Sequence, residues 1–375
     1  MKKSLRILLV IPTLELGGAE RQAIHLAKYL QEENHEIEVW GFNSPNGLGA
    51  KFCDELGVIH KCLHFYGGLG RFRYPIQLFK WTLKFRSFNP DIIYSFTDGP
   101  NVLCALIWRY TGAKGFIWGQ RSDKVLYSNM KQFKRALGKT KICISNSKVG
   151  IDSIKSNFKN HSNIDFHKVS NGIEKTKPIH SPKEWQIKLN IQNETKVALM
   201  ISNFSETCGK DHKSLIKSWP KVIRKYPSAI LLLAGRFDQF IDDYIQLAID
   251  LGILHSIRFL GKIRDISGLI SISDIIVHSS LNEGSPNAIL EGMKCKKPIV
   301  ATNIPGVKES LPKISHDYLV EVGDPRAFAE KIIELFNNTE TSRKVANINL
   351  EFVNKNYSIQ EMGEKTTRII LNNIN

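Results

Sequence analysis

Short apolar runs alternate with helix-like stretches through almost the whole chain, and this alternation constrains the fold more than any other feature of the sequence. Residues 6–12 form a nearly continuous apolar run, as expected for a central strand of a parallel sheet that is covered on both faces. Right-handed crossovers through the intervening helices then place helices on both sides of the sheet. The sequence therefore predicts α/β domains whose ligands bind at the carboxyl ends of the strands.

The expected strands form two series, because a chain of 375 residues is long for a single core. The first series, with helices near 75–86 and 101–110, comprises residues 6–12, 36–42, 61–65, 91–96, 115–120, 141–146 and 167–171. The second comprises residues 196–202, 229–235, 256–261, 274–278, 298–302 and 317–322. We therefore expect a Rossmann-like domain over residues 1–175, a polar linker over 176–195, a second Rossmann-like domain over 196–356 and a helical end over 357–375.

The most informative segment follows the expected strand 274–278 and reads Asn282-Glu-Gly-Ser-Pro-Asn-Ala-Ile-Leu-Glu291. Ser285 is placed to cap a helix that starts at Pro286, where a missing N–H costs nothing, and that continues to about Lys294. A glycine-bearing loop before a helix directs free N–H groups and the positive end of the helix dipole at one point, which suits a diphosphate.

Two carboxylates bracket this point, Glu283 in the loop and Glu291 in the helix. Carboxylates accept hydrogen bonds from sugar hydroxyls, and neither suits a phosphate. The simpler alternative is a capped helix with two solvated glutamates.

The segment from Glu283 to Glu291, followed by Pro298-Ile-Val-Ala-Thr302 and Gly306-Val-Lys-Glu309, resembles the glutamate, seven residues, glutamate motif of the retaining glycosyltransferases of family 4. The resemblance implies the GT-B fold, in which two Rossmann-like domains face a central cleft and a last helix packs back on the first. It implies that Glu283 faces the donor sugar and Glu291 the ribose. It also implies that the backbone covering the diphosphate is that of Gly284, Ser285, Pro286 and Asn287.

A second glycine-bearing loop, Gly17-Gly18-Ala-Glu-Arg21, follows the first expected strand. It lacks the spacing of a dinucleotide-binding motif or of a P-loop, and a tight turn without a ligand is the alternative. By resemblance, Gly17 and Gly18 belong to the loop that approaches the donor diphosphate from the first domain.

Family members commonly carry an arginine just after the first strand of the second domain and a lysine a few residues later, which together neutralise the diphosphate. Lys210 matches the lysine, but Asn203 stands where the arginine is expected. A neutral amide replaces neither the charge nor the bidentate grip of a guanidinium. We therefore expect Arg236, next to Gly235 after the neighbouring strand, to take over part of this task with the helix start at Ser285.

On the acceptor side, the candidates are Asp98 and Arg121, which follow two expected strands of the first domain. For either residue, a structural salt bridge or a loop cap explains the sequence as well as a catalytic role does. The family's Asn-Gly-Ile-Asp box is matched by Asn171-Gly-Ile-Glu174 except at its last residue.

The net charge of +16 is concentrated in the first domain, where residues 1–170 hold 25 Lys and Arg against 13 Asp and Glu. This excess fits an anionic lipid surface, a phosphorylated acceptor or a nucleic acid. Two basic clusters include aromatic residues: one is Arg71, Phe72, Arg73, Tyr74, Phe79, Lys80, Trp81, Lys84, Phe85 and Arg86, and the other is Lys131, Phe133, Lys134, Arg135, Lys139 and Lys141. Such clusters can lie on an anionic membrane, or they can be solvated helix faces with the aromatic residues in the core.

The sequence has no apolar window of 18 residues, and its start leads directly into a strand rather than a signal-peptide core. Six scattered cysteines and eleven histidines form no metal-binding pattern. We expect a cytoplasmic protein at the inner face of the cytoplasmic membrane, without a metal or a cofactor.

The leading hypothesis is a hexosyltransferase that moves sugar from a UDP- or GDP-linked donor to a lipid-linked or saccharide acceptor in bacterial surface polysaccharide synthesis. Lys210 and oriented N–H groups can stabilise the departing nucleoside diphosphate without a metal. The alternatives are a GT-B sugar-nucleotide epimerase and a non-catalytic basic protein that keeps the fold and binds a surface. Nucleic acid is not an expected partner, and the sequence predicts no oligomeric state.

Overall fold

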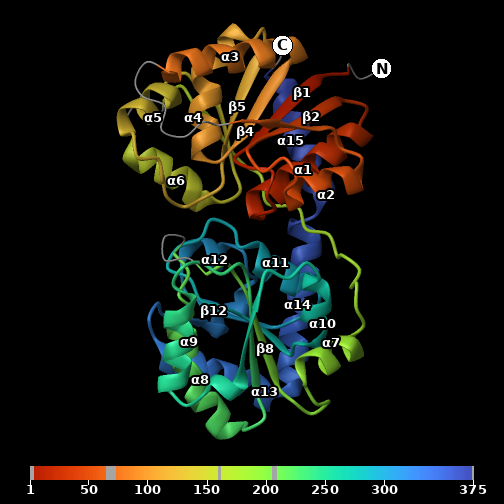
Figure 1. Cartoon of the computed structure of the whole chain (residues 1–375), viewed down its shortest axis with the longest axis vertical. Helices are drawn as coiled ribbons and strands as arrows, with labels where there is room; N and C mark the ends of the chain where they lie inside the picture. The colour runs from red at the N-terminus through yellow and green to blue at the C-terminus, as the bar shows by residue number, and fades with distance from the viewer. Residues whose placement is uncertain (1–3, 65–72, 159–161, 205–208, 374–375) are drawn as a thin grey trace. The chain divides into compact units, whose positions relative to one another are not determined.

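The computed structural model describes residues 4–64, 73–158, 162–204 and 209–373. The chain divides into two compact units, unit 1 with residues 1–172 and 358–375 and unit 2 with residues 173–357. Each unit contains one parallel sheet with helices on both faces (Figure 1). The expected fold class, two doubly wound Rossmann-like domains, is therefore confirmed.

The sheet of unit 1 has seven parallel strands in the order β3-β2-β1-β4-β5-β6-β7. Their bounds are β1 Arg6–Ile11, β2 Glu36–Phe42, β3 His60–Leu63, β4 Ile92–Phe96, β5 Gly115–Gln120, β6 Ile142–Ser145 and β7 Asp165–Lys168. Leu8 and Val10 of β1 pack into the core on one face, while Ile7, Leu9 and Ile11 pack into the core on the other. Burial on both faces explains why the first strand is apolar throughout instead of alternating.

The helices of unit 1 are α1 Gly18–Glu32, α2 Leu48–Leu56, α3 Arg73–Phe88, α4 Asp98–Ile107, α5 Met130–Leu137, α6 Lys148–Asn157 and α15 Ile359–Asn372, with a 3-10 helix, η1, at Trp108–Tyr110. The C-terminal helix α15 packs against α1. At Gly363 a Cβ atom would lie 2.2 Å from the ring of Tyr29. A glycine is required here because the two helices approach so closely.

The sheet of unit 2 has six parallel strands in the order β10-β9-β8-β11-β12-β13. Their bounds are β8 Val197–Ile201, β9 Ile230–Ala234, β10 Ile257–Gly261, β11 Ile275–His278, β12 Ile299–Thr302 and β13 Leu319–Val320. The helices are α7 Pro182–Leu189, α8 His212–Lys225, α9 Ile241–Asp250, α10 Ile266–Ile272, α11 Asn287–Lys294, α12 Pro305–Glu309, α13 Pro325–Asn337 and α14 Thr339–Asn356, with 3-10 helices η2 Leu254–Ser256 and η3 Lys313–Tyr318. All expected strands of both series are present.

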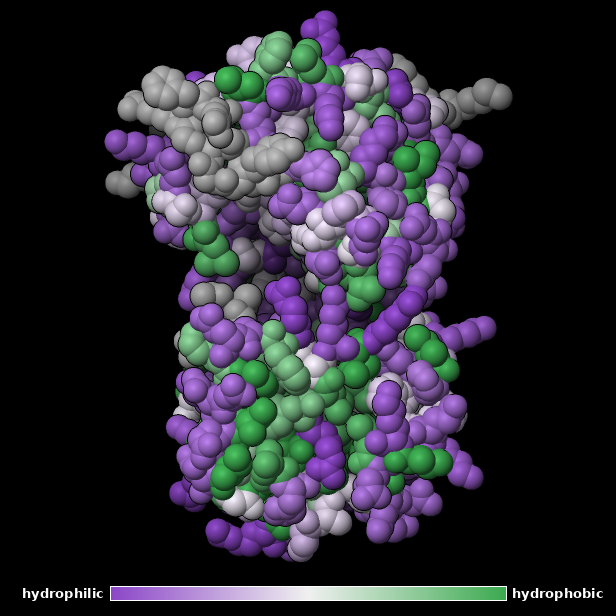
Figure 2. All heavy atoms as spheres, in the orientation of Figure 1, coloured by the Kyte–Doolittle hydropathy of each residue, from purple (hydrophilic) through white to green (hydrophobic). Residues whose placement is uncertain are grey.

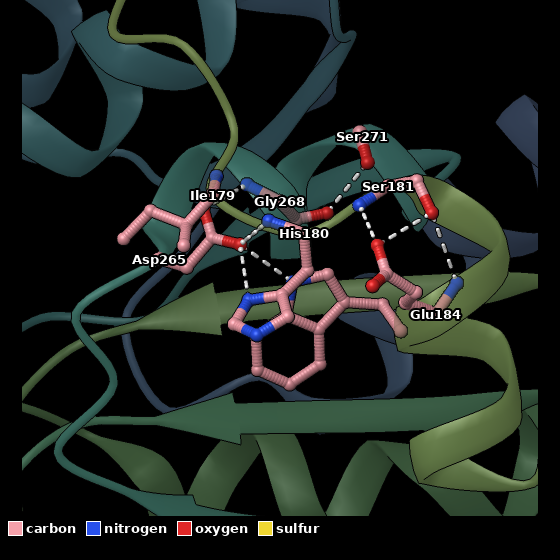
Figure 3. Close-up of polar contacts among 8 residues, drawn as sticks. Ile179, His180, Ser181, Glu184, Asp265, Gly268 and Ser271 are labelled. Carbon is pink, nitrogen blue, oxygen red and sulfur yellow. Dashed lines mark hydrogen bonds and ion pairs between the residues drawn. The ribbon is translucent and has the colours of Figure 1, made fainter.

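The polar segment expected as a linker contains the helix α7, which Pro182 begins and a capping box of Ser181 and Glu184 stabilises. The segment is fastened to unit 2 by Asp265, the N-cap of α10. The carboxylate of Asp265 accepts hydrogen bonds from the backbone N–H groups of Ile179 and His180 and from the Nε1 of Trp185, at 2.8 to 3.0 Å (Figure 3). Residues 179–185 are therefore an ordered part of unit 2.

Candidate functional site

The strand order of unit 2 reverses between β8 and β11, since the chain proceeds from β8 to β9 on one side and from β11 to β12 on the other. Open α/β sheets bind ligands at such a point, beyond the carboxyl ends of the two strands. The two loops that leave these ends are bonded together. The N–H of Leu281 donates to the oxygen of Gly209 at 2.7 Å, and the N–H of Asp211 donates to the oxygen of Ser279 at 3.1 Å.

The centre of this place is the carboxylate of Glu283. Its Oε1 accepts hydrogen bonds from the Nζ of Lys210, from the Nε2 of His278 at 2.8 Å and from the Oγ of Ser280 at 3.1 Å. The side chains of His278, Glu283 and Lys210 are 2%, 14% and 18% exposed. A largely buried cation, a carboxylate and two neutral donors thus meet at the switch point of the sheet.

The charges of this cluster follow from its partners. Burial raises the pKa of Glu283, but the Lys210 ammonium and the hydrogen bond from His278 outweigh burial and bring the pKa to about 2. Burial lowers the pKa of His278, and the bond to Glu283 offsets only part of this effect. At neutral pH the cluster therefore holds an ionised Glu283 and a neutral His278.

The helix α12 packs against the backbone of the loop that contains Glu283 and Gly284. A Cβ atom at Gly306 would lie 2.0 Å from the oxygen of Glu283 and 2.5 Å from that of Gly284. The absence of a side chain at Gly306 lets the helix approach the loop backbone and fixes its course. Glu291 is half-buried and is the fifth residue of α11.

The start of α11 differs from the expectation by one residue. Ser285 was expected to be the N-cap and Pro286 the first helical residue, but α11 begins at Asn287 and Pro286 is its N-cap. The reason is the backbone of Pro286, whose ψ of 109° is extended rather than helical. The expected end of the helix at Lys294 is confirmed.

Asn203 and Arg236 lie side by side after β8 and β9. The Oδ1 of Asn203 accepts a hydrogen bond from the N–H of Arg236 at 2.9 Å, and the side chain of Arg236 is exposed. Gly235 precedes Arg236, and a side chain is not tolerated there without a shift of the backbone, because a Cβ atom would lie 1.9 Å from the backbone oxygen of Ser202. Asn203 therefore holds the backbone of the arginine that was expected to compensate for it.

In unit 1, Gly17 is the N-cap of α1 and Gly18 its first residue. The carboxylate of Glu20 lies at this helix start, where burial raises its pKa and bonds from the N–H groups of Glu20 and Gly17 partly oppose the rise. The glycine loop thus has a carboxyl group of its own at the helix start.

Asp98 and Arg121 follow β4 and β5 of unit 1, and both have structural partners. Asp98 accepts a hydrogen bond from the N–H of Leu126 at 2.7 Å. The guanidinium of Arg121 donates to the hydroxyl of Tyr94 at 3.1 Å and lies 4.5 Å from the centre of the Phe96 ring. It also donates to Asn171, at 3.4 Å, which connects it to the Asn-Gly-Ile box.

Two members of the site were missed by the sequence analysis, His278 and Ser280. The available signal was a polar residue, His278, at the end of an apolar strand and five residues before Glu283. Within the described ranges, no group of three or more His, Cys, Asp or Glu side chains is placed to hold a metal ion.

The described residues of the basic clusters lie mostly on two helices of unit 1, α3 and α5, while Lys139 and Lys141 follow the end of α5. On α3, Trp81 and Phe85 are buried, whereas Ile76, Phe79 and Leu83 are 57%, 63% and 50% exposed. Figure 2 shows hydrophobic side chains among hydrophilic ones at the top of the view, where Figure 1 places α3. Arg71 and Phe72, and the side chains of Arg73 and Tyr74, lie outside the described part. On α5, Phe133 is buried, and the exposed cations are Lys131, Lys134 and Arg135.

None of the described helices is both long and apolar enough to cross a membrane.

Two family models match consecutive parts of the chain. The model described as Glycosyltransferase Family 4 matches residues 16–176, and the model described as Glycosyl transferases group 1 matches residues 181–351. Among curated relatives, a Bacillus subtilis protein named as a glycosyltransferase, EpsD, is 35% identical over 36% of this chain and 35% of its own length. The N-acetyl-alpha-D-glucosaminyl L-malate synthase of Bacillus anthracis is 30% identical over 41% of this chain and 40% of its own. The chain thus spans well under half the length of these relatives.

Solved structures resemble the chain over nearly its whole length. Anabaena Alr3699/HepE in complex with UDP-glucose has a TM-score of 0.85 at 17% identity and covers 98% of this chain and 100% of its own. A glycosyltransferase from Rickettsia africae has a TM-score of 0.83 at 23% identity and covers 99% of both chains. At these identities the likeness shows a shared fold.

Proposed function

Since the chain belongs to the family 4 glycosyltransferases and has the GT-B fold, we propose that it transfers a sugar from a nucleotide diphosphate sugar to an acceptor hydroxyl, with retention of anomeric configuration. The observation that carries the proposal is the group of Lys210, His278 and Ser280 around Glu283 at the switch point of unit 2. Such a place in an open α/β sheet favours a nucleotide ligand.

In this proposal the donor is bound mainly by unit 2. Lys210, the exposed Arg236 and the N–H groups that follow Glu283 neutralise the diphosphate, while Glu291 accepts hydrogen bonds from the ribose. A UDP-linked sugar is the first candidate, because Alr3699/HepE has been solved with UDP and with UDP-glucose. No metal is required, since a lysine and backbone amides supply the positive charge at the leaving group.

The same residues suggest how the bond to the leaving group breaks. A nucleoside diphosphate departs with two or three negative charges, and an ammonium that strengthens its interaction as these charges develop lowers the barrier. The acceptor hydroxyl then attacks from the face that the leaving phosphate occupied and gives its proton to an oxygen of that phosphate, so the configuration is retained. Glu283 remains ionised, orients the sugar and balances the positive charge of the oxocarbenium-like transition state.

We extend the proposal to a lipid-linked acceptor at the inner face of the cytoplasmic membrane. The exposed apolar residues Ile76, Phe79 and Leu83 on α3 are accompanied by exposed Lys80 and Lys84, and the sequence of α3 contains no acidic residue. A helix of this kind suits the surface of an anionic bilayer. An Escherichia coli relative, 29% identical over 32% of this chain, is named as a galactosyltransferase acting on a diphosphoundecaprenol-linked sugar.

The test is a panel of UDP- and GDP-linked sugars, assayed for release of nucleoside diphosphate with and without lipid-linked acceptors. We expect one donor to be consumed, and consumption to fall by about a hundredfold or more in Lys210→Ala and Glu283→Ala. Lys221→Ala is the matched control, since Lys221 forms an ion pair with Glu330 on the outside of unit 2, and it should keep full activity.

Each alternative gives a different result in this assay. Conversion of the donor to an isomeric sugar nucleotide without any acceptor indicates an epimerase. Salt-sensitive binding to anionic vesicles or DNA, without turnover of any donor, indicates a non-catalytic binding protein.

A further inference from the structure

His278 is a buried polar residue to which the proposed reaction gives no task. It is the last residue of β11, and its side chain is 2% exposed. Its Nε2 lies 2.8 Å from the Oε1 of Glu283, while no residue in the described ranges is bonded to its Nδ1. Burying an imidazole costs more than burying an apolar side chain, and the bond to Glu283 offsets part of this cost.

The direction of the bond is settled by the charge states. A carboxylate has no proton to donate, so the Nε2 of His278 carries the proton and donates it to Glu283. The imidazole is neutral because burial lowers its pKa and Glu283 restores only part of the fall. His278 therefore stabilises the carboxylate without adding a charge to the site.

The three donors to Glu283 differ in what else they are needed for. His278 and Ser280 come from the end of β11 and from the residues directly after it, and both are neutral. Lys210 comes from the other loop and holds the only positive charge of the three. In the proposed reaction the diphosphate competes with Glu283 for that charge. When the ammonium moves toward the phosphate, Glu283 depends on His278 and Ser280 to keep its orientation.

Resting on the proposed function, we propose that His278 is a positioning residue: it holds Glu283 toward the donor sugar while Lys210 exchanges its ion pair with Glu283 for the leaving diphosphate. His278 itself touches neither the sugar nor the phosphate. Loss of its bond is thus expected to affect the rate of the reaction and to leave the binding of nucleoside diphosphate nearly unchanged.

The test compares two substitutions. His278→Met removes the hydrogen-bond donor but keeps the length of the side chain. His278→Gln retains an amide N–H at the position of the Nε2 of His278. We expect kcat of His278→Met to fall about ten- to hundredfold, as for the loss of a hydrogen bond to a charged group. The KM for the donor and the Kd for UDP or GDP, whichever the wild type binds, should change by less than about threefold. His278→Gln should recover most of kcat.

A matched control is His316→Gln, because the Nε2 of His316 bonds only to the backbone oxygens of Lys308 and Leu311 among the residues described. It should have the kcat of the wild type. Thermal unfolding of every variant shows whether a low rate comes from an unfolded protein. If His278→Met is unfolded, His278→Leu, which also lacks a hydrogen-bond donor, takes its place.

A double-mutant cycle with Glu283→Ala separates a positioning role from any other, because alanine leaves His278 no acceptor to hold. If His278 acts through Glu283, adding His278→Met or His278→Gln to Glu283→Ala leaves kcat unchanged. Multiplied losses in the double variant, an unchanged kcat in His278→Met, or a loss confined to UDP binding would each overturn the inference. Absence of donor turnover in the wild type would instead overturn the proposed function.

Discussion

Asp265 offers the sharpest test of how the structure is stabilised. Its side chain is 3% exposed and accepts hydrogen bonds from three backbone N–H groups and an indole: Oδ1 from Ile179 and Gly268, and Oδ2 from the backbone of His180 and from Trp185. The Nδ1 of the His180 ring lies 3.3 Å from Oδ2 as a fifth partner. Burial raises the pKa of Asp265, but these bonds outweigh burial and lower the pKa from 3.8 to about 2. This fall corresponds to about 2 kcal/mol of stability, since one pH unit is about 1.4 kcal/mol.

The perturbation is Asp265→Asn, which keeps the shape but presents an amide N–H₂ to one pair of N–H donors. Two of the four bonds are lost, and we expect a cost of about 2 to 3 kcal/mol. Because the folded pKa is lower than the unfolded one, the contribution is fully present above about pH 4 and disappears as the pH falls through about 2. Measured in a His180→Gln background, which removes the imidazole 3.3 Å from Oδ2, the cost should therefore be the same at every pH from 5 to 8.

Hydrogen exchange of the full chain measures the loss of local stability in Asp265→Asn. The amides of Ile179, His180 and Gly268 should exchange about 30-fold faster in Asp265→Asn, which is the equivalent of 2 kcal/mol. Asp324→Asn is the control: Asp324 is also an N-cap, but it accepts one bond, from the N–H of Ala327 at 2.9 Å. The amide oxygen of asparagine still accepts this bond, so the substitution should cost less than about 0.5 kcal/mol. Equal costs for the two variants, or a cost that changes between pH 5 and 8, would refute the reasoning.

Three further predictions concern the site, the sheet and the surface. Glu283→Gln should lower the rate of transfer about a hundredfold with little change in UDP or GDP binding, as checked by steady-state kinetics and calorimetry. In the wild type, the rate should show no titration of Glu283 between pH 8 and pH 5, because its pKa of about 2 keeps it ionised. In urea unfolding, Gly235→Ala should destabilise unit 2 by about 1 to 3 kcal/mol through the clash with Ser202. Gly99→Ala is the control and should be neutral or stabilising, because its new methyl group meets no atom within 4 Å. Lys80→Glu with Lys84→Glu should weaken binding to vesicles with anionic lipid at least tenfold, while Lys183→Glu with Lys217→Glu on unit 2 should not; equal effects in co-sedimentation would contradict a specific role of α3.

The strands could be predicted from the sequence because burial on both faces of a parallel sheet requires apolar runs, and each crossover helix separates one run from the next. The helix α7 was not predicted, although its signals were present. The polar segment 176–195 was interpreted as a linker, but Pro182 is the first residue of a helix that Ser181 and Glu184 cap. A proline excludes a helix interior and favours a helix start, and only the capping pair distinguishes the two cases.

The site was predicted where charge and family motif coincide, at Lys210 and Glu283, which the structure brings together. The contribution of His278 and Ser280 could not be predicted, because it depends on how the loop after β11 folds back over the strand end. The role of Asn203 was incompletely predicted for a related reason. Its bond to the backbone of Arg236 joins the ends of two neighbouring strands, β8 and β9. The two residues are far apart in the sequence, so this contact could be recognised only in the fold.

The two buried carboxylates of unit 2 show why a perturbed pKa does not by itself locate a functional site. Asp265 and Glu283 both have a pKa of about 2, but they reach it through different partners. The donors to Asp265 are three backbone N–H groups and an indole, fixed by the course of the chain, so no ligand can replace them without local unfolding. Glu283 depends on a lysine ammonium at the end of a flexible side chain, which an anionic ligand can withdraw. A carboxylate whose main partner can be exchanged is suited to a reaction, and one whose partners are all fixed is suited to holding the fold.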